Sequence, residues 1–331
     1  MNRAILVKLP NWMGDILFSY DLLYTLSKQF DRVGILTSSQ HADLVRIFPQ
    51  PNTELITYPA EEWPYLSAAT RRRIKEFNAQ GCLLLPNSFG AALALRRAGI
   101  SHLYGYRCEH RRWLLKKSIA APTRRLHQRL YYLELLRLFD LQPLDYPGPE
   151  PSSREPMVIL HPGASKPPRA WHLERFVKVA EAMREKGFEP IFVSGERVRV
   201  GPFRVIVRPP LQELCDLLRR CSLFIGNDSG PLHLAQQCGA PVVGIYGPGD
   251  PLITGPRPCS PSRVVYHGFP CSPCRQKFFK ECSPAASGKP FCLETINPEE
   301  VLKAGIELIE KKEEGTGHMP PAPNSSEVTL S

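Results

Sequence analysis

The stretch IGNDSGPLHLAQQCGAPVVGIYGPGDP, residues 225–251, decides the fold because it places two strand signals around one short helix signal. Each apolar run ends in a loop rich in glycine, proline and polar side chains. The segment between the runs, residues 231–239, has the length and composition of a short helix. A strand–loop–helix–strand order is typical of parallel strands joined by a right-handed crossover. We therefore predict an α/β fold whose loops share the carboxyl edge of a parallel sheet.

The same alternation runs through both halves of the chain. In the second half, strand signals start at residues 157, 190, 223 and 241, and helix signals cover residues 172–187, 211–221, 231–239 and 297–314. In the first half, strand signals cover residues 4–9, 33–38 and 82–88, with a helix signal at 16–30. Each strand feeds a helical stretch, as in βαβ units. Both halves are thus predicted to be α/β domains.

A proline-rich stretch separates the two halves. Residues 142–156 read QPLDYPGPEPSSREP and contain five prolines, which favours a linker. Four divisions follow: an N-terminal domain over residues 1–145, a linker over 146–156, a C-terminal domain over 157–312 and a disordered tail over 313–331.

Length and composition restrict the class of protein. The 331 residues are enough for two cores, and the hydrophobic content of 43% is ordinary for a globular protein. No apolar run approaches the ~20 residues that a membrane-spanning helix needs. The first residues, MNRAILVKLPNWMGD, do not have the pattern of a secretory signal. We expect a cytoplasmic protein whose ten cysteines are reduced or bound to metal rather than paired.

Positive charge is concentrated in one segment. The chain carries a net charge of +10, and residues 96–137 contain eleven Lys or Arg against two Glu. Such a segment attracts polyanions: nucleic acid, anionic lipid or a phosphorylated sugar. The alternative is a solvated basic face without a ligand.

Four loops of the second half are predicted to share one sheet edge: HPGASKPPRAW, SGE, GNDSGPLH and GPGDP. In NDSGPLH, the start of a helix offers unpaired N–H donors for an anion. Asp228 or Ser229 there is equally suited to cap the helix, so a plain helix start is the alternative. The loop with Ser165, Lys166 and Arg169 adds the cations that a diphosphate needs.

One carboxylate is predicted to face these loops from the first half. Asp15 in PNWMGD follows the first strand and lies at a helix start, so it is either a helix cap or a general base. The chain has no GxGxxG and no GxxxxGK[ST] motif, which argues against a dinucleotide fingerprint and a P-loop. A basic cleft, a diphosphate-binding edge and one facing carboxylate indicate group transfer from an activated sugar.

Four segments resemble a known family. PNWMGDILFS, LLLPNSFGAALALRRAGISHLYGYRCEHRRWLL, HPGASKPPRAWHLERF and NDSGPLHLAQQCGAPVVGIYGPGDP are similar to the bacterial ADP-heptose:lipopolysaccharide heptosyltransferases of glycosyltransferase family 9, most of all to type II. The resemblance covers roughly residues 4–312. It implies a GT-B fold, in which two Rossmann-like domains with parallel sheets face each other across a cleft.

The resemblance also implies an activity and its residues. A member of this family would transfer L-glycero-D-manno-heptose from ADP-heptose to the heptose of the lipopolysaccharide inner core, with inversion and without a metal cofactor. Asp15 matches the family's base, and the D-[ST]-G-x-x-H donor motif matches Asp228, Ser229, Gly230 and His233. Arg169 in PRAW replaces the lysine that often precedes RW in the family, and Ser165 and Lys166 join the donor group.

The basic segment then has a partner in the anionic lipid A–core acceptor. The predicted acceptor contacts are Asn11, Arg107, Arg111, Arg112 and Lys116. The same charges are expected to hold a monomeric enzyme against the inner face of the inner membrane. No nucleic-acid partner is expected.

Cysteines form a separate motif. Cys271, Cys274, Cys282 and Cys292 are spaced C-x₂-C-x₇-C-x₉-C, which is compatible with a structural zinc site or with free or redox-paired thiols. His161 and His267 are interpreted as structural histidines.

Two alternatives stay open. One is another nucleotide-sugar transferase of the same fold. The other is a basic nucleic-acid-binding module with a Cys₄ zinc ribbon, which would leave the two-domain loops unexplained.

Overall fold

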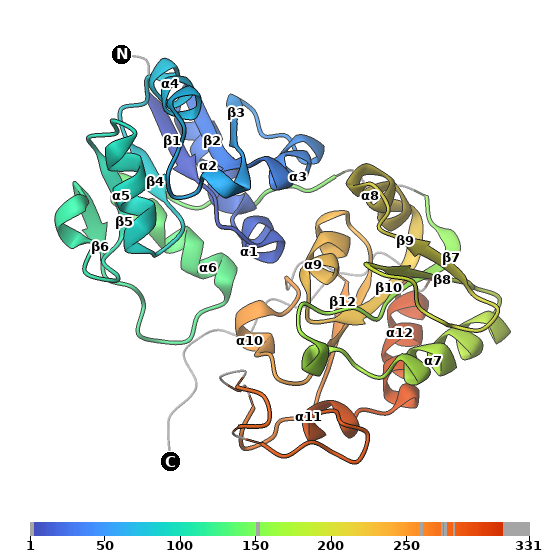
Figure 1. The fold of residues 1–331 in the computed structure, drawn as a ribbon. Coiled ribbons are helices and arrows are strands. Elements are labelled where there is room, and N and C mark those ends of the chain that lie inside the picture. Colours follow the sequence, from blue (N-terminus) through green and yellow to red (C-terminus); the bar gives the residue numbers. More distant parts are fainter. Residues whose placement is uncertain are drawn as a thin grey trace.

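The computed structural model describes residues 3–149, 153–257, 261–272, 274, 277–280 and 282–313. It contains two six-stranded parallel sheets, each flanked by helices (Figure 1). The first sheet has the order β3 (Thr53–Tyr58), β2 (Arg32–Ser38), β1 (Ala4–Lys8), β4 (Cys82–Leu84), β5 (Leu103–Tyr106) and β6 (Lys117–Ile119). The second has the order β12 (Ser262–Tyr266), β11 (Val242–Tyr246), β10 (Cys221–Asn227), β7 (Glu155–His161), β8 (Glu189–Ser194) and β9 (Arg204–Val207).

Helices connect the strands in both halves. The first half has α1 (Met13–Phe18), α2 (Tyr20–Gln29), α3 (Ala42–Ile47), α4 (Ala68–Phe77), α5 (Phe89–Arg97) and α6 (Gln128–Leu133). The second has α7 (Leu173–Glu185), α8 (Leu211–Arg220), α9 (Gly230–Gln237), α10 (Pro251–Thr254), α11 (Phe291–Glu294) and α12 (Pro298–Glu313). Among the described residues, no helix is both long and apolar enough to cross a lipid bilayer.

Burial explains why the central strands form where the sequence predicts them. Every residue of β1 and β11 is buried, as expected for parallel strands covered by helices on both faces. In α7, Phe176, Val179, Ala180 and Met183 recur at helical spacing and pack into the core of the second sheet. The buried central strands and the apolar face of α7 thus lie where the apolar pattern of the sequence predicts them.

The predicted elements differ from the structure mainly at the sheet edges. The sequence interpretation lacked β3, β5, β6, β9 and β12, most of which are short or only partly buried. The helix predicted over residues 16–30 is two helices, because the Ser19 hydroxyl donates to the Ile16 carbonyl and ends α1. Residues 142–149 and 153–154 of the proline-rich stretch form no helix or strand, whereas β7 begins at Glu155, inside the predicted linker. Residues 150–152 of the predicted linker and 314–331 of the predicted tail lie outside the described residues.

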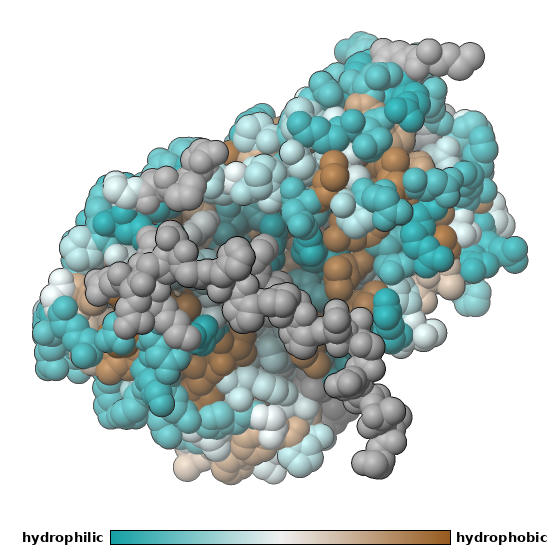
Figure 2. All heavy atoms as spheres, turned by 180° about the vertical axis from the view of Figure 1, so that it is seen from behind, coloured by the Kyte–Doolittle hydropathy of each residue, from teal (hydrophilic) through white to brown (hydrophobic). Residues whose placement is uncertain are grey.

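The two halves contact each other through α1 and α9. The ring centroids of Phe18 and His233 lie 4.5 Å apart, and the His127 ring bonds the Gly255 carbonyl at 2.9 Å. Arg257 lies 3.7 Å from the buried Asp21 carboxylate. Figure 2 shows the two lobes from behind, with hydrophilic residues covering much of that face. These contacts close one side of a cleft between the carboxyl edges of the two sheets.

Candidate active site

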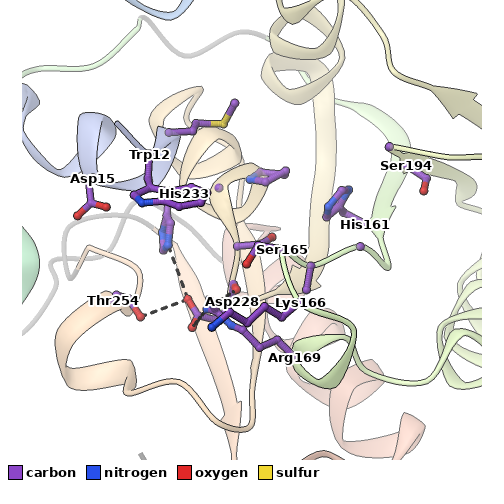
Figure 3. Close-up of a pocket in the computed structure, with 18 of the residues that line it drawn as sticks. Trp12, Asp15, His161, Ser165, Lys166, Arg169, Ser194, Asp228, His233 and Thr254 are labelled. Carbon is purple, nitrogen blue, oxygen red and sulfur yellow. Dashed lines mark hydrogen bonds and ion pairs between the residues drawn. The ribbon is translucent and has the colours of Figure 1, made fainter. Parts of the chain in front are cut away.

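A cleft of about 770 Å³ lies between the two halves and is lined by loops that follow β1, β7, β8, β9 and β10. Figure 3 shows Asp15 on one wall and Lys166, Arg169 and Asp228 on the other. Eight residues predicted from the sequence line this cleft: Asp15, Ser165, Lys166, Arg169, Asp228, Ser229, Gly230 and His233. Seven of them meet because they follow β7 and β10 at the carboxyl edge of the second sheet, and Asp15 follows β1 at the carboxyl edge of the first sheet, across the cleft.

Asp15 does not act as a helix cap. The N-cap of α1 is Trp12, which makes no side-chain capping bond, and Asp15 lies inside the first turn. Its Oδ1 instead accepts a hydrogen bond of 3.2 Å from the Tyr132 hydroxyl of α6. Burial raises the pKa of the Asp15 carboxyl, and the Tyr132 bond opposes that rise. The geometry argues against the helix-cap role, and the role of general base stays a prediction.

Asp228 organises the opposite wall (Figure 3). Its Oδ2 accepts from Arg169 Nη2 at 2.6 Å, and its Oδ1 accepts from the Thr254 hydroxyl at 3.2 Å. The same Arg169 nitrogen also donates to the Asp228 carbonyl at 2.9 Å. Burial raises the pKa of the Asp228 carboxyl, while the Arg169 charge lowers it. The pair fixes the guanidinium in the cleft and leaves its buried Nε without a hydrogen-bond partner.

The start of α9 is not a plain capped helix start. Ser229 is the N-cap residue, but its side chain makes no capping bond and its hydroxyl donates to the Asn227 carbonyl at 3.1 Å. The first N–H groups of α9 therefore lie at the cleft without a side-chain cap. A helix N-terminus in this state favours an anionic ligand.

His233 is a neutral side chain. Burial, followed by the charges of His127, Arg169 and Arg257, lowers the pKa of its imidazole to about 3. Its Nε2 lies 3.9 Å from Asp228 Oδ1. The ring therefore offers hydrogen bonding and packing to a ligand rather than charge.

Several cleft residues were not singled out from the sequence. Trp12, Glu196, Arg208 and Thr254 belong to this group. The sequence interpretation also lacked Tyr132, which bonds Asp15 but is not among the lining residues. The predicted edge loop SGE contains Glu196, but Arg208 follows β9, which the sequence interpretation lacked. His161, interpreted as structural, bonds the Val193 carbonyl at 2.8 Å and also lines the cleft. His267 lies in contact with Thr295 and Glu300.

The predicted acceptor contacts do not line the cleft. Arg111 is fully buried, and its guanidinium donates to oxygens of Tyr106, Pro86 and Asn87, so its prediction as a direct acceptor contact is wrong. Arg107, Arg112 and Lys116 are exposed outside the cleft. Arg111 was interpreted as a surface residue because it lies in a basic segment. Nothing in the sequence indicated that its guanidinium would donate to backbone carbonyls in the interior.

Asn11 also lies outside the cleft. Its Oδ1 accepts from Lys8 Nζ at 3.3 Å, and its carbonyl bonds the His41 ring at 2.9 Å. Burial lowers the pKa of Lys8 to about 7, and its Nζ lies 4.6 Å from the Trp63 ring centroid. This network holds the loop between β1 and α1, so Asn11 supports the position of Asp15.

The four cysteines line a second cavity of about 150 Å³, together with Phe269, Phe278 and Phe291. Within the described part of the chain, no group of three His, Cys, Asp or Glu side chains is arranged to hold a metal. The cavity brings the motif together, while its zinc content stays a prediction.

Gly249 provides a test of the Asp228 wall. A Cβ on Gly249 would lie 2.2 Å from Asp228 Oδ2, a distance that forces the carboxylate away from Arg169. We expect Gly249→Ala to lower kcat/KM by roughly 10²-fold, because small displacements of positioning groups have effects of this size. Gly90→Ala is the matched control, since nothing lies within 4 Å of its added Cβ. Steady-state kinetics of both variants measure the difference, and equal rates would show that the carboxylate position is not critical.

The fold and cleft define the class of protein: two parallel α/β domains facing across a ligand cleft form the GT-B fold of glycosyltransferases. Solved structures with this arrangement include Escherichia coli ADP-heptose lipopolysaccharide heptosyltransferase II, with a TM-score of 0.74 and 23% identity over 94% of this chain and 99% of that chain. A family 9 glycosyltransferase from Veillonella parvula gives a TM-score of 0.76 at 20% identity, over 94% and 98% of the two chains. The predicted fold class is thus confirmed.

Sequence comparison finds a family match in the second half of the chain. Residues 151–283 match glycosyltransferase family 9 (heptosyltransferase), so this part of the chain is a family 9 glycosyltransferase domain. Lipopolysaccharide heptosyltransferase 2 of Escherichia coli K12 is 26% identical over 76% of this chain and 85% of its own length. Lipooligosaccharide heptosyltransferase 2 of Campylobacter jejuni serotype O:2 is 22% identical over 92% and 98%. The resemblance seen in the sequence motifs is confirmed.

Proposed function

We propose that this enzyme transfers L-glycero-D-manno-heptose from ADP-heptose to the heptose of the lipopolysaccharide inner core, with inversion. The observation that carries the proposal is one cleft with Asp15 on one wall and the Arg169–Asp228 pair with the start of α9 on the other. The names of the relatives support the sugar and the acceptor class.

Asp15 acts as general base in this proposal. Its carboxylate takes the proton of an acceptor hydroxyl while that oxygen forms a bond to the anomeric carbon. The bond from that carbon to the diphosphate oxygen breaks, and ADP leaves with the electron pair. Attack opposite the leaving group inverts the configuration in one step. A partly buried carboxylate with a raised pKa is a stronger base than an exposed one.

The donor wall stabilises the charge that develops on the diphosphate. Arg169 makes two hydrogen bonds to Asp228 through Nη2, which leaves Nη1 for phosphate oxygens. Lys166 is exposed at the cleft and adds a point charge, and α9 presents its uncapped N-terminus. Fixed donors aimed at developing charge are the largest catalytic contribution in many enzymes. The chemical step is therefore proposed to proceed without a bound metal.

The acceptor places the enzyme at a membrane in this proposal. A lipid A–core acceptor is anchored in a bilayer, so we propose a peripheral, monomeric enzyme at the cytoplasmic face of the inner membrane. The exposed basic side chains of the first half support this location.

A donor screen tests the proposal. Purified enzyme is incubated with heptose-primed lipid A core and either ADP-heptose, UDP-sugars or GDP-sugars, and release of the nucleotide diphosphate is followed. We expect turnover with ADP-heptose alone. Turnover with another nucleotide sugar and none with ADP-heptose would instead favour a different transferase of the same fold.

A further inference from the structure

The loop between β5 and β6, residues 107–116, presents an exposed indole among exposed cations. Trp113 lies in the short helix Arg112–Leu114 and is 70% exposed, an unusual state for a large aromatic side chain. Arg107, Arg112 and Lys116 are exposed on the same short loop. We call residues 107–116 the β5–β6 platform.

Buried contacts hold the platform in place. The Arg111 guanidinium donates to the Tyr106 carbonyl at 3.0 Å and to Asn87 Oδ1 at 3.4 Å, which ties the platform to the loop after β4. The rings of Phe89 and Trp113 lie 5.8 Å apart, so one edge of the indole is supported while the rest faces solvent. The exposed tryptophan is therefore a fixed feature of the surface.

The platform carries uncompensated positive charge. Across the ranges that the structure describes, Arg107, Arg112 and Lys116 form no ion pair with a carboxylate. The one acidic side chain of the platform, Glu109, accepts a hydrogen bond of 3.1 Å from the Phe89 N–H. An anionic partner is favoured at this surface.

The sheet order relates the platform to the cleft. The strands run β1-β4-β5-β6, so the loops after β1, β4 and β5 succeed one another along a single carboxyl edge. Asp15 follows β1, and the platform follows β5 two strands away. A partner that binds the platform therefore lies next to the wall of the cleft that carries Asp15.

We propose that the β5–β6 platform docks on an anionic phospholipid bilayer, with Trp113 entering the headgroup region and Arg107, Arg112 and Lys116 contacting lipid phosphates. The inference rests on the proposed function, because a lipid-anchored acceptor is reached at a bilayer. Tryptophan is enriched at membrane–water interfaces, and basic side chains bind anionic lipid electrostatically. A protruding ring outside the cleft suits a flat bilayer better than the sugar phosphates of one acceptor molecule.

Vesicle binding tests the platform directly. The full chain is sedimented with vesicles of phosphatidylcholine alone or mixed with phosphatidylglycerol. We expect binding to the anionic vesicles that weakens with added salt, and a loss of roughly tenfold in affinity for Trp113→Ala and for Arg112→Glu. Tyr65→Ala and Arg71→Glu are matched controls, since Tyr65 is 76% exposed and Arg71 is an exposed cation of α4. Binding by wild type that the platform variants do not reduce would overturn the proposal, as would wild type that binds no anionic vesicles.

A second measurement separates membrane docking from acceptor recognition. With a water-soluble, delipidated acceptor, Trp113→Ala should retain its kcat/KM, whereas with vesicle-embedded acceptor kcat/KM should fall roughly tenfold. An equal loss on both acceptors would overturn docking and place Trp113 in acceptor binding. Failure of wild type to transfer heptose concerns the proposed function alone, because the vesicle assay needs no turnover. Thermal unfolding of each variant confirms that it is folded.

Discussion

Asp15→Asn is expected to lower kcat by roughly 10²–10⁴-fold, the range that a general base contributes. Asparagine keeps the shape of the side chain and can still accept the hydrogen bond from Tyr132, but it cannot take a proton from the acceptor hydroxyl. The donor wall is untouched, so the dissociation constant for ADP should stay near the wild-type value. Turnover near the wild-type rate in this variant would remove Asp15 as the base.

The pH profile gives an independent signature of the same group. Burial raises the pKa of Asp15, and a base works only when deprotonated, so kcat should rise with pH through a pKa above that of an exposed carboxyl. Tyr132→Phe removes the hydrogen bond that opposes this rise. We therefore expect the acidic limb of the kcat–pH profile to move to higher pH in Tyr132→Phe. The profile of Asp15→Asn should lack that limb. An unchanged limb in Asp15→Asn would assign it to another group.

Stability should move in the opposite direction to activity in Asp15→Asn. A raised native pKa means that the contribution of Asp15 to stability is present below its unfolded pKa and is lost as pH rises through its folded pKa. At neutral pH the ionised carboxylate is thus unfavourable to the fold, and asparagine removes that cost. Thermal unfolding at neutral pH should show an unchanged or higher Tm, which separates loss of chemistry from loss of structure.

The sequence predicted the candidate site better than the sheet edges. Residues such as Arg169 and Asp228 were placed together because parallel topology brings the strand-to-helix loops of one sheet to one edge, a rule that needs only the order of elements. The edge strand β9 was missed because its burial is partial and its apolar signal is weak. Arg111 was misplaced because its burial depends on carbonyls of Pro86 and Tyr106, which come close only after folding. Local sequence patterns predict the order of strands and helices. They do not predict which individual side chains and carbonyls come into contact after folding.

Substitution of Arg169 is expected to cause the second large loss of activity. Arg169→Lys should lower kcat/KM for ADP-heptose by roughly 10²–10³-fold, as expected when one donor to developing charge is lost. Lysine keeps the charge, but it cannot bond Asp228 and the diphosphate at once through a planar fork. Lys166→Met serves as a comparison, since Lys166 is exposed and should be screened by solvent, with a smaller loss.

Coupling to Asp228 distinguishes catalysis from simple destabilisation. Removing the cation altogether in Arg169→Met leaves the buried Asp228 carboxylate without an ionic partner, because the neutral Thr254 hydroxyl is its other side-chain hydrogen-bond donor within the described ranges. Breaking such a pair costs about 3–5 kcal/mol, so Arg169→Met should lower Tm. The double variant Arg169→Met with Asp228→Asn removes the stranded charge and should recover much of that stability while kcat/KM stays low. Recovery of activity together with stability would mean that Arg169 only supports the fold and that other donors stabilise the departing diphosphate.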